Sequence, residues 1–126
     1  MDSLQIEKVL EANPVTRQWF RGCVPSDMLL HPSSFPTSHV VNLDPSRKEG
    51  SHWIGLFVPN KNEIFYFDSL KKDIPQSINN FLKSFPKFKT NKIPYQSLFY
   101  ETCGPHAIVF IYYLSLDIHL NNIYIY

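Results

Sequence analysis

Cys103 and His52 are the residues of this sequence with the most suggestive chemistry. Cys103 stands directly before Gly104 and Pro105, where an apolar helix is predicted to begin, and proline suits only the first turn of a helix. A thiol at a helix N-terminus feels the positive end of the helix dipole, which favours the thiolate. His52 directly precedes an apolar segment that starts at Trp53. A thiolate beside an imidazole can attack a carbonyl carbon, with the histidine as its base.

Asp68 is the residue best placed to assist this histidine. If the apolar segments 53–58 and 63–67 pair as a hairpin, residues 52 and 68 lie side by side at its open end. An aspartate there could hold the imidazole in one tautomer and stabilise its charged form. Each residue taken singly also fits a structural role: Cys103 as a core thiol, His52 as a strand end and Asp68 as a turn former.

Gln96 and Gly104 complete the candidate set. Gln96 lies seven residues before Cys103, so its amide could donate to an oxyanion together with the Cys103 backbone N–H. Gly104 leaves room for a substrate to approach the thiol. His106 would share a helix face with Cys103, but the remaining histidines are scattered, and structural zinc needs four ligands. We therefore expect no metal and no resident cofactor.

Hydrophobic periodicity and prolines predict the elements that must position these residues. A first helix, capped by Asp2 or Ser3, is expected to bury Ile6, Val9 and Leu10 and to end at Asn13-Pro14. The remaining chain predicts an irregular stretch over 17–37, strands over 39–42, 53–58 and 63–67, a helix over 74–85, a short strand over 92–95, and an apolar helix from 103 to about 116. Strand 53–58 and the last helix are apolar nearly throughout, so both are expected to be central. This order predicts an α+β fold.

Length and composition bound the remaining possibilities. A chain of 126 residues suits a single domain, here 1–126, and 15% aromatic residues help a small core to form. The net charge of +1 gives no long-range attraction for nucleic acid or an anionic membrane. The one basic stretch, with Lys83, Lys87, Lys89 and Lys92, is expected to be a solvated face, and it is the only place where DNA binding would be sought.

The cysteines and the N-terminus bear on the compartment. Two cysteines, Cys23 and Cys103, do not make a disulfide scaffold, and Cys23 has no assigned role. The N-terminus shows no secretory signal, and the longest apolar run, 107–114, is too short to cross a bilayer. We therefore expect an intracellular protein with reduced thiols and no membrane partner.

Several segments together carry a family resemblance. They are Phe20-Arg21-Gly22-Cys23-Val24-Pro25-Ser26-Asp27, His39-Val40-Val41-Asn42-Leu43-Asp44, Gly50-Ser51-His52-Trp53-Ile54, Tyr66-Phe67-Asp68-Ser69, Tyr95-Gln96 and Cys103-Gly104. The order His, Asp, Gln, Cys, with His before Trp and Cys before Gly, resembles the adenovirus-type (adenain-like) cysteine endopeptidases. The chain is most similar to those encoded by Maverick/Polinton elements. SUMO-deconjugating cysteine proteases share the same catalytic order and are the main rival. The resemblance covers roughly residues 18 to 117.

The resemblance implies a fold, an activity and a role for each residue. The fold would be a circularly permuted papain-like peptidase core, with the Cys103 helix packed on a small mixed sheet. Cys103 would be the nucleophile, His52 the base and later the acid, Asp68 its orienter, and Gln96 the oxyanion donor. Trp53 and Gly104 would shape a cleft that accepts glycine or another small residue before the scissile bond. The substrate would be a viral or transposon-encoded precursor protein, cut in the host cytoplasm or nucleus or in the virion.

Some features depart from that family. Pro105-His106 and Leu70-Lys71 stand where relatives commonly have aromatic residues or glycine, and relatives usually continue with further helices beyond the central one. These departures suggest a C-terminally truncated copy and keep open a catalytically inactive, protein-binding remnant. A ubiquitin-like-protein deconjugating protease also remains open. Adenovirus relatives use an activating peptide and DNA, but neither maps onto particular residues here, and the oligomeric state is left undetermined.

Overall fold

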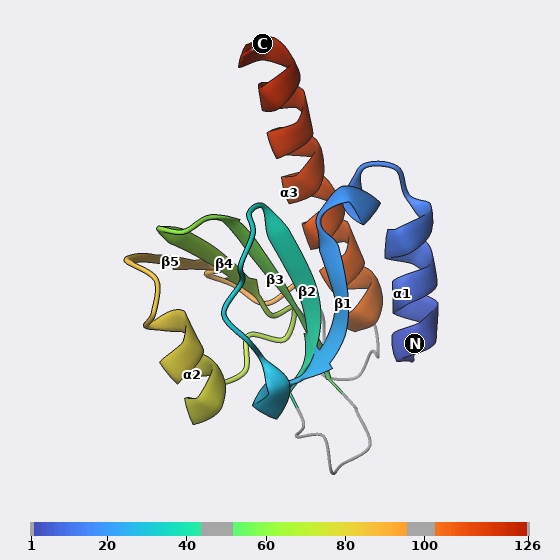
Figure 1. The fold of residues 1–126 in the computed structure, drawn as a ribbon. Helices are drawn as coiled ribbons and strands as arrows, with labels where there is room; N and C mark the ends of the chain where they lie inside the picture. Colours follow the sequence, from blue (N-terminus) through green and yellow to red (C-terminus); the bar gives the residue numbers. More distant parts are fainter. Residues whose placement is uncertain (1, 44–51, 96–102, 126) are drawn as a thin grey trace.

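The computed structural model describes residues 2–43, 52–95 and 103–125. A five-stranded sheet lies between two layers of helices, with α1 and α3 on one face and α2 on the other (Figure 1). The elements in chain order are α1 (Ser3–Ala12), η1 (Thr16–Gln18), β1 (Phe20–Pro25), η2 (Ser26–Met28), β2 (Thr37–Asn42), β3 (Trp53–Asn60), β4 (Glu63–Phe67), α2 (Gln76–Leu82), β5 (Lys87–Thr90) and α3 (Cys103–Ile125). The predicted α+β fold class is confirmed.

The sheet is mixed, and β3 is its central strand. β3 runs antiparallel to β2 and β4, whereas β1 and β5 pair in parallel at the two edges. β3 is buried along most of its length because it is apolar on both faces: Ile54 and Leu56 join the core under α2, and Trp53 joins the core under α1 and α3. The predicted central strand over 53–58 is confirmed and continues to Asn60.

The β3–β4 hairpin brings the two ends of its strands together. Gly55 pairs with Phe67, and the register is antiparallel. His52 directly precedes β3 and Asp68 directly follows β4, so both residues lie at the same edge of the sheet, opposite the hairpin turn. The hairpin that was expected to place these two residues side by side therefore forms.

α1 begins with a reciprocal cap. The Oδ1 atom of Asp2 accepts the backbone N–H of Gln5 at 2.9 Å, and Gln5 Oε1 accepts the N–H of Asp2 at 2.8 Å. Ile6 and Leu10 are buried against α3, as predicted, whereas Val9 is 45% exposed. The apolar face of this helix is thus narrower than its sequence suggested.

Four other elements differ from the predictions. β1 falls within the stretch expected to be irregular; a bulge between Phe20 and Cys23 and a φ of 108° at Gly22 interrupt its alternation. No strand forms over 92–95. The strand lies at Lys87–Thr90 instead, where all four residues are exposed and give no apolar pattern. α2 is shorter than the predicted helix 74–85 because it begins only after Pro75 and ends before Lys83. α3 is longer than expected and reaches Ile125.

α3 lies across one face of the sheet and is not enclosed on all sides. Ala107 and Ile111 face the core, but Val109 is 51% exposed and Tyr113 is 63% exposed. The expectation of a fully central helix was therefore wrong, since the sheet and α1 pack on only part of its surface. Among the described helices, none has the length and apolar content needed to cross a bilayer.

Gly55 lets α3 approach the sheet closely. A Cβ atom on Gly55 would lie 2.6 Å from Cδ2 of Phe110, whose ring stacks on Phe67 with centroids 5.0 Å apart. We expect Gly55→Ala to lower the free energy of unfolding by about 1–3 kcal/mol, as overpacking usually does. Urea unfolding measures this. In the Phe110→Ala background the same substitution should cost much less; an equal cost in both backgrounds would contradict the proposed clash.

Candidate active site

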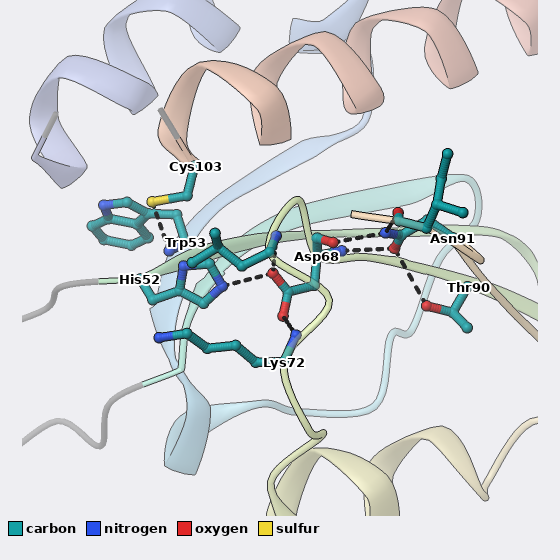
Figure 2. Close-up of polar contacts among 9 residues, drawn as sticks. His52, Trp53, Asp68, Lys72, Thr90, Asn91 and Cys103 are labelled. Atoms are coloured by element: carbon teal, nitrogen blue, oxygen red, sulfur yellow. Dashed lines mark hydrogen bonds and ion pairs between the residues drawn. The ribbon is translucent and has the colours of Figure 1, made fainter. Parts of the chain in front are cut away.

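His52 and Asp68 form a buried pair at the open end of the β3–β4 hairpin. The Nε2 atom of His52 lies 2.7 Å from Oδ1 of Asp68 (Figure 2). His52 is only 5% exposed and Asp68 only 2%. Since a buried charge is stable only when it is paired and hydrogen-bonded, this contact accounts for an acidic side chain at so dry a position.

Cys103 is the first residue of α3 and lies over the start of β3. Its sulfur accepts the backbone N–H of Trp53 at 3.4 Å, and the residue is 8% exposed (Figure 2). The thiol and the imidazole also interact, since each lies close enough to shift the pKa of the other. Because Nε2 of His52 is bonded to Asp68, Nδ1 is the ring nitrogen left for the thiol. The three side chains therefore form one chain from Asp68 through His52 to Cys103.

The electrostatic environment of these three side chains favours a negative charge on Cys103 and a positive charge on His52. Burial alone would lower the pKa of His52, but its hydrogen bonds to Asp68 and Cys103 outweigh burial and raise the pKa to about 9. Burial would likewise raise the pKa of Cys103, yet the bonds from His52 and from the Trp53 N–H lower it. Both shifts favour a thiolate beside an imidazolium, which is the reactive form of a cysteine nucleophile.

Backbone N–H groups fix the orientation of the Asp68 carboxylate. Oδ1 accepts the N–H of Leu70 at 2.9 Å, and Oδ2 accepts the N–H of Lys72 at 3.0 Å. Burial raises the pKa of this carboxyl, but the contact with His52 and these two N–H groups bring it below its ordinary value. Sequence reasoning missed both donors; the signal for them was an aspartate at a strand end, where such residues often bond the backbone of the next turn.

The remaining predicted residues fall in different places. Trp53 is 8% exposed, and the contact it makes with Cys103 is through its backbone. Gly104 is buried as the second residue of α3. Gln96, the candidate oxyanion donor, lies outside the described residues. In the basic stretch, Lys89 pairs with Glu63 at 3.1 Å.

The chemistry near α3 includes an apolar pocket but no metal centre. Phe67, Tyr95, Pro105, His106, Val109 and Phe110 line a pocket of about 420 Å³, and two of these residues belong to the first turn after Cys103. Its apolar walls suit apolar ligand atoms. Within residues 2–43, 52–95 and 103–125, no group of three or more His, Cys, Asp or Glu side chains is arranged to hold a metal ion.

The two cysteines should react very differently. Burial, together with the nearby Glu7 and Glu11, raises the pKa of Cys23 to about 12, the opposite of the shift at Cys103. At pH 6 an ordinary thiol is less than about 1% thiolate, so we expect Cys103 to be alkylated at least about tenfold faster than Cys23. Mass spectrometry at each site measures the rates. His52→Ala should abolish this preference, and equal slow labelling of both cysteines in the unmodified protein would contradict the activated pair.

Comparison with known proteins places this site in a protease fold. No protein-family model and no curated protein matches the chain. Among solved structures, the ASFV pS273R protease superposes with a TM-score of 0.66 at 14% sequence identity, over 90% of this chain and 57% of that chain. A selenomethionine form of the same protease gives a TM-score of 0.46 at 26% identity, over 62% of this chain and 34% of that one. A de-sumoylating protease gives 0.47 at 18% identity, over 94% and 54%.

The chain therefore spans little more than half of the ASFV protease that it resembles, and it shares the fold of that part. The match covers 90% of a chain that consists of a five-stranded mixed sheet with helices on both faces, one of which begins at Cys103. A cysteine-peptidase type of fold, expected from the sequence, is confirmed.

Proposed function

We propose that this chain is a cysteine-type endopeptidase. Cys103 acts as the nucleophile, His52 as general base and acid, Asp68 as the residue that orients His52, and Gln96 as an oxyanion donor. The observation that carries the proposal is the arrangement of three side chains at the N-terminus of a long helix: Asp68 bonds to His52, and His52 interacts with Cys103. Lowered thiol pKa, raised imidazole pKa and mutual contact occur together in nucleophilic cysteine enzymes.

Each group has a defined task in the reaction. The Cys103 thiolate adds to the peptide carbonyl carbon, and the oxyanion that forms is stabilised by the Cys103 backbone N–H and the Gln96 amide. The His52 imidazolium gives its proton to the leaving amine as the C–N bond breaks, which produces a thioester on Cys103. His52 then takes a proton from water as that water attacks the thioester, and the acid product and free thiol result. Asp68 keeps Nδ1 of His52 directed at the sulfur throughout.

The substrate class follows from the resemblance to adenovirus-type and Maverick/Polinton-encoded peptidases. We propose cleavage after glycine or another small residue in a viral or transposon-encoded precursor protein. Trp53 and Gly104 lie directly beside His52 and Cys103 in the chain, so they are positioned to limit the size of the residue before the scissile bond. An activating peptide or DNA stays a proposal that rests on the resemblance alone.

A peptide library tests this function. The protein is incubated with peptides derived from a whole proteome, and new termini are mapped by mass spectrometry, with Cys103→Ala as the matched control. Cleavage after small residues, absent in the control, supports the proposal. Cleavage confined to the C-terminal tails of ubiquitin-like conjugates would redirect it to a deconjugating protease. If the protein cleaves neither the peptides nor ubiquitin-like conjugates, the proposal is overturned in favour of a protein-binding remnant.

A further inference from the structure

Asn91 holds the backbone of Asp68 on both sides. It directly follows β5, and its Oδ1 atom accepts the N–H of Asp68 at 3.0 Å, while its Nδ2 atom donates to the carbonyl of Asp68 at 2.7 Å (Figure 2). Nδ2 also donates to the carbonyl of Ile93 at 2.9 Å. The side-chain amide thus pairs with Asp68 much as a peptide group of a neighbouring strand would.

This pairing extends the sheet where the backbone ladder stops. The parallel β4–β5 register ends with Tyr66 opposite Thr90, so Asp68 lies beyond the last of the registered backbone pairs. Asn91 supplies the missing donor and acceptor from its side chain. When both the N–H and the C=O of a residue are bonded, the peptide planes on either side are fixed, and the direction of its Cα–Cβ bond is fixed with them.

The other bonds of Asp68 differ in origin. Those from the N–H groups of Leu70, Lys71 and Lys72 come from within four residues, so they move together with Asp68. Asn91 lies 23 residues further along the chain, beyond α2 and β5. The same segment is tied again by the Tyr95 N–H, which donates to the Ser69 carbonyl at 2.7 Å. The 91–95 segment therefore anchors the Asp68 turn to the sheet edge.

We propose that Asn91 is a positioning residue of the peptidase centre: it holds Asp68 where its carboxylate meets Nε2 of His52. This inference rests on the proposed function. Asn91 touches neither His52 nor Cys103 by any bond recorded among the described residues, so it acts through Asp68. A displacement of about 1 Å in a catalytic group can cost about 100-fold in rate, and we expect Asn91→Ala to lower kcat by about tenfold with little change in KM.

The test reads His52 directly and does not require peptidase activity. The pKa of His52 is measured by NMR titration of its imidazole in the full chain, with and without Asn91→Ala. We expect a value near 9 in the unmodified protein and a shift towards the ordinary 6.5 in the variant. Asn60→Ala is the matched control, because Asn60 accepts the N–H of Asn62 at 2.9 Å in the turn at the opposite end of the same hairpin. It should lower stability without moving the His52 titration.

The outcomes separate the two proposals. A value near 9 that Asn91→Ala leaves unchanged would overturn the positioning role and leave the proposed function intact. A wild-type value near 6.5 would instead undermine the activated Cys–His pair itself. If Asn91→Ala does not fold, Asn91→Gln replaces it: this variant keeps a neutral amide but moves it one methylene outwards, so the shift should keep its sign. An unchanged titration in Asn91→Gln together with an unchanged kcat would likewise overturn the role.

Discussion

Peptide hydrolysis by the Cys103→Ala variant is expected to fall to the background rate, a loss of about 10⁴-fold or more, since removing the nucleophile of a catalytic set abolishes its joint effect. The fold should be retained, because alanine removes only a sulfur atom from a helix terminus whose core neighbours, Ala107 and Ile111, stay in place. Hydrolysis of a reporter peptide from the library measures the loss, and circular dichroism verifies the fold.

Two further variants make this result specific. Cys103→Ser keeps a nucleophilic atom, but its hydroxyl does not ionise near neutral pH and cannot form the ion pair with His52, so its rate should also fall to background. Cys23→Ala should hydrolyse the peptide at the wild-type rate, because the thiol of Cys23 donates to the Ser3 carbonyl and takes no part in the contacts among Asp68, His52 and Cys103. Full activity of Cys103→Ala would remove Cys103 from the role of nucleophile.

The sequence predicts those parts of the fold in which apolar pattern and local chemistry agree. β3 is apolar on both faces, α1 begins at an aspartate cap, and α3 begins where a proline suits only a first turn, so these three were placed correctly. β5 was missed because its stability comes from pairing with β4 while all its residues are exposed. β1 was missed because Gly22 and a bulge break its alternation. Hydrophobic patterning detects burial, and edge strands have little of it.

Part of the candidate site could likewise be predicted from the sequence, and part could not. The sequence could predict that His52 lies beside Asp68, because an antiparallel hairpin fixes which residues lie together at its open end. The contact between Cys103 and His52 could not be predicted in this way, since it depends on how α3 crosses β3. That crossing is set by Gly55 and Phe110. Only the family resemblance suggested it beforehand. Asn91 carried no local signal, because its role arises from a partner 23 residues away.

Hydrolysis should depend on pH between two limits set by Cys103 and His52. The reaction needs Cys103 deprotonated and His52 protonated, so activity should rise as pH passes the lowered pKa of the thiol and fall as pH passes about 9, where His52 loses its proton. The two groups interact, so these limits belong to the pair as a whole. Alkylation of Cys103 needs only the thiolate, and it should not decline above pH 9. Rates of both reactions between pH 5 and about 10 measure this difference.

Asp68→Asn should narrow that pH window from both sides. The asparagine keeps an oxygen for His52 but lacks the negative charge that favours the imidazolium, so the pKa of His52 falls and the alkaline limb moves to lower pH. A less charged His52 in turn stabilises the thiolate less, so the pKa of Cys103 rises and the acid limb moves to higher pH. The ion pair then becomes a minor state, and we expect the maximal rate to fall by about 100-fold or more, the range of general acid–base effects. His52→Ala should lose at least as much and show no alkaline limb at all. An Asp68→Asn profile with unchanged limbs would mean that the carboxylate holds the turn through Leu70 and Lys72 and does not tune His52.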